Sequence, residues 1–202
     1  MSVSKPVQVL ECLTLMLFLT TSQGATVRAS LTRVFIDPPS LTIDAGDSFT
    51  VNVSISNVSS LYGCEFKLYY NSTAMNGTQV AEGSFLESGG SVLFRVMNFT
   101  DHYDTAQGLA WVICTLVRSN VSVNGSGVLA TMTFKSLSAG EPALLHLADV
   151  SLLDPSYSPI PYEDVDGTIT VIPEFPPLVP ALTLIAASIP IVLVRKRTTR
   201  KV

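Results

Sequence analysis

Two short segments of the chain gather the side chains that acid–base or metal chemistry would need. Residues 101–104 read Asp-His-Tyr-Asp, and residues 163–167 read Glu-Asp-Val-Asp-Gly. The first segment lacks the paired-ligand spacing of zinc sites, so a polar loop capped by aspartates is the better interpretation. The second could bind calcium, but it departs from the EF-hand pattern, which favours a solvated turn before the last strand. With no phosphate-cradling glycine loop or nucleophile elbow in the sequence, we expect no catalytic residue, no metal, no cofactor and no enzymatic activity.

Glycosylation is the modification for which the sequence offers most sites. Every asparagine of the chain is followed two positions on by Ser or Thr, with no intervening Pro, and so forms an N-glycosylation sequon: Asn52, Asn57, Asn71, Asn76, Asn98, Asn120 and Asn124. Such saturation predicts an exported surface that carries N-glycans. The alternative is a β-protein rich in Asn and Thr whose turns happen to fit the pattern.

The charge of the chain is unevenly distributed. Of its 202 residues 47% are hydrophobic and only 14% are charged, and the formal net charge is −4. A soluble domain carries about 25% charged residues, so some of the apolar content belongs to targeting or membrane segments. Between Ala25 and Ile172 the acidic residues outnumber the basic ones, whereas the last eight positions are strongly basic. An acidic body argues against a nucleic-acid binder, whose surface is basic.

The N-terminal segment has the pattern of a secretory signal. Lys5 precedes the short apolar run 12–19, and small or polar residues follow up to Ala25. This order predicts a signal peptide over 1–24, cleaved after Gly24. A short apolar run could also be a buried helix of the mature fold.

The C-terminal segment has the pattern of a membrane anchor. Residues 176–194 carry no charge and are long enough to span a bilayer. The basic residues of 195–202 should stay in the cytoplasm by the positive-inside rule, which places the rest of the chain outside the cell. We therefore expect an extracellular domain anchored at the cell surface by a transmembrane helix, with a cytoplasmic C-terminus.

The exit from the domain carries a short motif. Pro173, Glu174 and Phe175, followed by the apolar run and the basic cluster, resemble the PEF-type C-terminal sorting tails of archaeal surface proteins. That resemblance implies that a membrane sorting enzyme cuts at the motif and transfers the protein to another anchor. The alternative is that 173–177 is a Pro-rich, semi-rigid stalk before an ordinary membrane helix.

The body of the chain alternates apolar and polar residues between turn signals. Residues 49–56 and 64–70 alternate strictly, which is typical of half-buried strands. Evenly spaced short strands predict one antiparallel sandwich without a second domain. The expected fold is all-β, a nine-stranded antiparallel β-sandwich with jelly-roll topology, with strands near 31–36, 48–57, 63–70, 75–81, 91–99, 109–117, 127–137, 143–153 and 166–172.

Five pieces of this body follow one another in a recognisable order. The pieces begin with Pro39-Ser-Leu-Thr-Ile-Asp-Ala-Gly-Asp47, and continue with Gly63-Cys-Glu-Phe-Lys-Leu-Tyr-Tyr-Asn71, Leu109-Ala-Trp-Val-Ile-Cys114, Gly127-Val-Leu-Ala-Thr-Met-Thr-Phe134 and Val165-Asp-Gly-Thr-Ile-Thr-Val171. This order resembles the cohesin domain, the jelly-roll sandwich best known from cellulosome scaffolds. The resemblance implies a cohesin-like sandwich over 25–172. Asn71-Ser72 stands where the family usually has Asp-Pro, a departure confined to a turn.

Two cysteines remain once the signal peptide, which holds Cys12, is removed. Alternation puts Cys64 and Cys114 each on a buried face, and an even pair outside the cell permits a disulfide. In the cohesin arrangement the two strands that hold them are neighbours, which favours the linked pair. The alternative is two inert buried thiols.

The opposite faces of the same two strands are the candidate binding surface. If Cys64 and Cys114 point inward, residues of the other parity face solvent, and in cohesins this sheet binds the partner module, dockerin. The residues so implied are Glu65, Lys67, Tyr69, Trp111, Ile113 and Thr115, with Trp111 as an aromatic anchor. The alternative places Trp111 in the core and Cys114 outside, because lone tryptophans are mostly buried.

Three functions compete on these observations. The first is a surface-anchored, non-catalytic recognition module that binds an extracellular protein, such as one that bears a dockerin. The second is a carbohydrate-binding module linked to polysaccharide breakdown, although Tyr62, Tyr69, Tyr103 and Trp111 form no evenly spaced line. The third is a structural surface glycoprotein without a discrete ligand. A sheet face free of glycans would indicate the first.

Overall fold

The computed structural model describes residues 31–174, and every element below lies in that range. The expected signal peptide at 1–24, Phe175 of the sorting motif, the apolar run 176–194 and the basic tail 195–202 lie outside the described residues. Between residues 31 and 174 no helix is both long and apolar enough to cross a membrane.

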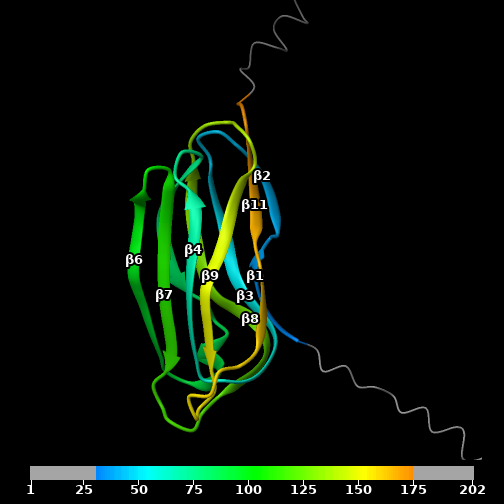
Figure 1. The fold of residues 1–202 in the computed structure, drawn as a ribbon, viewed down its shortest axis with the longest axis vertical. Helices are drawn as coiled ribbons and strands as arrows, with labels where there is room; N and C mark the ends of the chain where they lie inside the picture. Colours follow the sequence, from blue (N-terminus) through cyan, green and yellow to red (C-terminus); the bar gives the residue numbers. More distant parts are fainter. Residues whose placement is uncertain (1–30, 175–202) are drawn as a thin grey trace, which may run out of the picture. The chain divides into compact units, whose positions relative to one another are not determined.

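Within the described range the chain folds into two sheets. The strands are β1 (Thr32–Asp37), β2 (Ser40–Asp44), β3 (Ser48–Leu61), β4 (Gly63–Asn71), β5 (Met75–Glu82), β6 (Val92–Asp104), β7 (Gln107–Leu116), β8 (Val123–Ser136), β9 (Ala143–Leu153), β10 (Tyr162–Val165) and β11 (Gly167–Ile172), with a 3-10 helix, η1 (Leu86–Gly89), before β6. The five-stranded sheet has the order β10-β1-β3-β8-β5, and the six-stranded sheet has the order β2-β11-β9-β4-β7-β6. Figure 1 shows the six-stranded sheet from β6 across to β2, with β1, β3 and β8 behind it.

The core lies between the two sheets and follows from the alternation of the central strands. In β4 the buried residues are Cys64, Phe66, Leu68 and Tyr70, none more than 4% exposed, and the residues between them are only partly buried. β3 and β8 repeat the pattern from the opposite sheet. Each large apolar side chain so buried contributes roughly 1.5–3 kcal/mol, which makes this alternation the main determinant of the sandwich.

The structure corrects the expected strand count, because eleven strands rather than nine occur between residues 31 and 174. The two missed strands, β2 and β10, are short edge strands whose residues are mostly exposed or partly exposed. β2 pairs in parallel with β11, and β10 pairs in parallel with β1, so the sandwich is not wholly antiparallel either. β2 alternates strictly, but it has only five residues and β10 only four, and neither strand buries a side chain fully. Strands this short at the edge of a sheet give little signal in the sequence.

Three expected boundaries are also wrong. β8 was expected to begin at residue 127, but it begins at Val123. β3 was expected to end at residue 57, but it continues to Leu61 through register shifts, with positive φ angles at Asn57 and Ser60. Asn124 stabilises this irregular stretch, because its Oδ1 accepts a hydrogen bond from the Ser60 backbone N–H at 2.8 Å. β6 likewise runs through residues 101–104, which were expected to form a loop.

Candidate functional site

Strands β4 and β7 lie side by side near the centre of the six-stranded sheet, and their pairing decides which side chains share a face. Cys64 lies opposite Cys114, Glu65 opposite Ile113, and Lys67 opposite Trp111. Directly paired residues project from the same face of a sheet, and alternate residues project from opposite faces. The structure therefore brings the six candidate side chains together on the outer face, which we call the β4–β7 face: Glu65, Lys67, Tyr69, Trp111, Ile113 and Thr115.

The inner side of the same two strands holds the cysteine pair. Cys64 and Cys114 are 4% and 1% exposed, their Cα atoms are 5.2 Å apart, and a disulfide joins them. The disulfide implied by the family resemblance is therefore present. Because Cys114 is buried and Trp111 is only partly buried on the other side of β7, the alternative arrangement of this strand is wrong.

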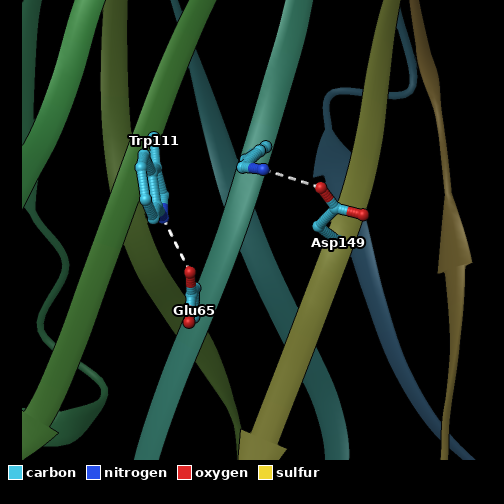
Figure 2. A network of polar contacts seen from close by, with 4 residues as sticks. Glu65, Trp111 and Asp149 are labelled. Carbon is cyan, nitrogen blue, oxygen red and sulfur yellow. Dashed lines mark hydrogen bonds and ion pairs between the residues drawn. The ribbon is translucent and has the colours of Figure 1, made fainter.

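A polar network orders the tryptophan on the outer face. The Trp111 Nε1–H donates a hydrogen bond to Glu65 Oε1 at 2.7 Å, and the Lys67 ammonium lies 5.1 Å from the centroid of the indole ring. Lys67 Nζ also forms an ion pair with Asp149 Oδ2 at 2.8 Å (Figure 2). The indole is thus held by a hydrogen bond at its edge and a cation near its ring before any partner arrives. A cation–π contact of this exposure is worth about 0.5–1 kcal/mol.

Asp149 reaches this network because β9 carries an irregularity. Lys67 pairs with Ala148 and Glu65 pairs with Ser151, so β9 has one residue more than β4 in this interval. Asp149 adopts a left-handed conformation with φ of 48°, which aspartate tolerates better than most residues. The Asp149 carboxylate, by accepting the hydrogen bond from Lys67, raises the pKa of the Lys67 ammonium. Lys67 therefore stays charged throughout the neutral range.

One end of the β4–β7 face is aromatic and borders a groove. The Tyr69 ring lies 5.6 Å from that of Tyr103 in β6 and 6.5 Å from that of His146 in β9, between centroids. Partial burial raises the pKa of the Tyr69 phenol, so this side chain remains an uncharged donor. The groove has a volume of about 510 Å³, and the residues lining it include Tyr69, Asn71, Asp104, Gln107, Leu144 and His146. Polar and aromatic groups therefore occur together there.

The segment 101–104 has a structural role. Asp101 Oδ1 accepts hydrogen bonds from the Tyr70 hydroxyl at 2.7 Å and from the Gly77 backbone N–H at 2.8 Å, and so links β6 to β4 and to β5 of the other sheet. Asp104 Oδ1 accepts a hydrogen bond from the Thr105 backbone N–H at 2.7 Å. Both aspartates thus accept hydrogen bonds from groups of the fold itself. The segment belongs to strand β6, so the expected loop is wrong.

The carboxylates of 163–167 are likewise engaged with the fold. Glu163 lies in β10 and pairs with Arg33 at 3.5 Å. Asp166 accepts a hydrogen bond from the Leu147 backbone N–H at 2.9 Å and contacts His146 Nδ1 at 2.8 Å. The expected solvated turn is therefore wrong for residues 163–165, which form a strand. In residues 31–174 no three His, Cys, Asp or Glu side chains are grouped so that they could hold a metal ion.

The seven sequons are distributed over both sheets. Asn52 and Asn57 lie in β3, Asn76 in β5 and Asn124 in β8, all in the five-stranded sheet, and Asn120 lies in the connection between β7 and β8. Asn71 ends β4, where its Oδ1 accepts hydrogen bonds from Thr73 N and Oγ1 at 2.9 and 2.7 Å. Asn98 lies in β6 beside the β4–β7 face, so this face meets the condition set above for a recognition module, a face free of glycans, only while Asn98 is unmodified.

Sequence reasoning missed the residues that complete the face from neighbouring strands. Asp149 and His146 come from β9, and Tyr103 comes from β6. The sequence pattern marks Tyr103 only as a candidate sugar-binding aromatic and assigns no role to His146. The order of strands in the sheet was the missing information, since no local pattern states which strand lies beside β4.

The fold and the face together define a β-sandwich recognition module. The sheet presents an ordered tryptophan, an aliphatic side chain and both signs of charge on one outer face, as protein-binding surfaces tend to do. The buried polar groups of the described residues serve the fold, with none of their buried side-chain N or O atoms left without a partner.

The family model of the cohesin domain matches residues 34–171, and the chain belongs to this family. Cohesin domains are non-catalytic protein–protein interaction modules. A comparison with curated protein sequences finds no match to this chain.

Several solved structures share the fold. A non-cellulosomal cohesin from the hyperthermophilic archaeon Archaeoglobus fulgidus is 19% identical, with a TM-score of 0.57 over 71% of this chain and 92% of that one. The cohesin of a type I cohesin–dockerin complex from Clostridium thermocellum, Coh-OlpA–Doc918, is 16% identical, with a TM-score of 0.58 over 71% of this chain and 100% of that one. The solution structure of CaCohA2 from Clostridium acetobutylicum is 18% identical, with a TM-score of 0.55 over 72% and 93%. At these identities the likeness concerns the fold.

Proposed function

We propose that this protein is a cell-surface cohesin module that binds a dockerin-type protein through its β4–β7 face. The observation that carries the proposal is the ordered Trp111, which is partly buried on the outer face of the sheet and is held there by Glu65 and Lys67. Tryptophan is among the residues most enriched at energetic hot spots. Cohesins of similar fold have been solved in complex with dockerins, which supports the class of partner.

The chemistry of the face favours a protein as the ligand. Trp111 and Ile113 offer apolar area, while Glu65 and Lys67 offer one charge of each sign at neighbouring positions. A partner that covers Ile113 and stacks on the indole would gain apolar burial without ordering the indole, because the hydrogen bond to Glu65 already fixes its orientation. Preorganisation of this kind lowers the entropic cost of binding.

The proposed cellular arrangement follows from the ends of the sequence. Residues 1–24 direct export, 25–172 form the extracellular module, 176–194 anchor it, and 195–202 stay in the cytoplasm. Pro173, Glu174 and Phe175 serve as a sorting motif or, with the rest of 173–177, as a stalk. N-glycans decorate the exported surface at several of the sequons. Intact-mass measurement of native protein should show loss of 1–24 and added sugar; a retained Met1 and an unmodified mass would contradict this arrangement.

Carbohydrate binding is a second candidate, favoured by the groove at the end of the β4–β7 face. Tyr103 is 51% exposed and lies against Tyr69, and polar side chains such as Asn71 and Gln107 line the groove nearby. Sugars bind by stacking on exposed aromatics with hydrogen bonds to adjacent polar groups. Loss of polysaccharide retention in a Tyr103→Ala variant would favour this function over protein docking.

One capture experiment distinguishes the two functions. The 25–174 fragment, immobilised beside its Trp111→Ala variant, is exposed to secreted proteins and, separately, to polysaccharides. Protein docking predicts a defined protein retained by the wild type and lost with Trp111→Ala. Polysaccharide retention that is insensitive to Trp111→Ala, or no retention of protein at all, would overturn the docking proposal.

A further inference from the structure

Asn98 is the sequon that lies beside the β4–β7 face. The pairing of β6 with β7 sets Asn98 directly opposite Trp111, so the two residues are neighbours across adjacent strands. Paired residues in a sheet have Cβ atoms about 4.5–5.5 Å apart. No other sequon is paired with a residue of the β4–β7 face in the described strand registers.

The neighbours of Asn98 show that its side chain points outward. Phe99, the next residue, packs against the core, and a Cβ placed on Gly77 of the opposite sheet would collide with the Phe99 ring. Since successive residues of a strand alternate between faces, Asn98 shares the outer face with Trp111. A register shift between Val96 and Asn98 leaves Met97 unpaired and 51% exposed, so the strand is irregular and open just before the sequon.

The side-chain amide of Asn98 is available for modification. Oδ1 of Asn52, Asn71 and Asn124 accepts hydrogen bonds from other side chains or backbone groups. Within residues 31–174 the amides of Asn98, Asn57 and Asn76 make no such hydrogen bond, so what distinguishes Asn98 is its position opposite Trp111. Thr100, whose hydroxyl completes the sequon, is two residues after Asn98 and so lies on the same outer face of β6. Its hydroxyl accepts a hydrogen bond from the His102 backbone N–H at 3.1 Å.

We propose that Asn98 is a glycosylation site whose occupancy closes the β4–β7 face to the partner. A sugar attached to Asn98 Nδ2 is wider than the distance between paired side chains, so a glycan that leans toward β7 covers the Trp111 indole. Asn76, by contrast, pairs with Lys135 on the outer face of the five-stranded sheet, and a glycan there leaves Trp111 accessible. The closing of the face to a partner rests on the proposed docking function, whereas the shielding of Trp111 does not.

The modification is a transfer from a lipid-linked sugar phosphate donor. Asn98 Nδ2 forms a bond to the anomeric carbon of the first sugar as the bond from that carbon to the donor phosphate oxygen breaks. The lipid phosphate leaves with the bonding electrons, and the amide proton passes to a base of the transferring enzyme. Oxidation states are unchanged.

Because Trp111 is the single tryptophan of the chain, its fluorescence reports directly on the shielding. The full chain is produced in a host that glycosylates Asn-X-Ser/Thr sites, alongside Asn98→Gln and the control Asn76→Gln. Peptide mass spectrometry should find a glycan on Asn98, and acrylamide should quench the Asn98→Gln protein at least twofold more strongly than the wild type or Asn76→Gln. Enzymatic removal of glycans from the folded wild type should give the same increase without any substitution.

An unmodified Asn98 peptide, or equal quenching before and after glycan removal, would overturn the proposal. In the partner-capture experiment, Asn98→Gln should retain at least tenfold more protein than the glycosylated wild type. Equal retention would overturn the proposal that the glycan closes the β4–β7 face to the partner. If no form captures a protein while the difference in quenching persists, the docking function fails and the shielding of Trp111 stands.

Discussion

Lys67 and Trp111 face each other across β4 and β7, with the ammonium 5.1 Å from the centre of the indole ring. Asp149 holds the ammonium at 2.8 Å, and Glu65 holds the indole N–H at 2.7 Å. Three side chains from two neighbouring strands, β4 and β9, therefore fix the geometry of one partly buried aromatic ring on the outer face of the sheet.

Replacing Trp111 with Ala should weaken partner binding by about thirtyfold or more, because truncation of a central aromatic anchor typically costs at least ~2 kcal/mol. The fold should persist, since the indole lies outside the core cluster. Titration calorimetry with the captured partner measures the first effect, and thermal unfolding measures the second. Lys135→Ala, on the outer face of the other sheet, is the control and should change neither.

Substitutions of Asp149 should distinguish its charge from its backbone conformation. Asp149→Asn removes the ion pair to Lys67, and because exposed pairs contribute about 0–1 kcal/mol, the free energy of unfolding should change little. Asp149→Ala should cost roughly 1–2 kcal/mol more, because alanine is strained at a φ of 48°. Urea denaturation of the two variants checks this difference. Equal stabilities would mean that the left-handed conformation carries no cost.

Reduction of the disulfide should lower the stability of the 25–174 fragment. The cysteines are separated by 50 residues, and closing a loop of that length is worth about 4 kcal/mol in the chain-entropy model. For a domain of this size the melting temperature should fall by on the order of 10 °C. Calorimetry with and without reductant measures the shift. Labelling of both thiols in unfolded, unreduced protein would show that the bond is absent.

Tyr70 should make stability fall at high pH. Burial, with the hydrogen bond to Asp101, raises the pKa of the Tyr70 phenol far above its ordinary value near 10. Above pH 10 the unfolded chain releases this proton while the folded protein retains it, so deprotonation favours unfolding by about 1.4 kcal/mol per pH unit.

A Tyr70→Phe variant isolates this contribution. At pH 7 it should be less stable than the wild type by about 1–2 kcal/mol, because a buried hydrogen bond to Asp101 is lost. The difference between the two proteins should shrink as the pH rises from 10 to 11. Denaturant titrations at pH 7, 10 and 11 provide the measurement, and a difference independent of pH would contradict the assignment to Tyr70.

The strict alternation of residues 64–70 was sufficient to predict which side chains of β4 are buried, because a strand with one buried face repeats every two residues. The same parity placed Trp111 outside and Cys114 inside β7. The structure adds the register of the pairing, which sets Lys67 opposite Trp111. This register depends on the path of the chain between β4 and β7, so neither segment alone predicts it.

The missed parts of the site have a common cause. Asp149 enters through an extra residue in β9, and Asn98 lies opposite Trp111 after a shift in β6, so both depend on irregular pairing between distant segments. The carboxylate-rich sequence of β10 predicts a solvated turn. In the structure this segment is instead an edge strand that pairs with β1. Such contacts are decided by tertiary packing, which no window of sequence contains.

The position of β11 has a mechanical consequence. The strand is hydrogen-bonded to β9 in an antiparallel pair and to β2 in a parallel pair, and the described chain ends two residues beyond it, at Glu174. If the tail is anchored as proposed, a tethered partner that pulls on the β4–β7 face transmits tension along β11. The hydrogen bonds on both sides of β11 run across the direction of that tension, so the strand is loaded in shear. In this geometry the hydrogen bonds share the force and must break together, whereas a strand pulled sideways would lose them one after another.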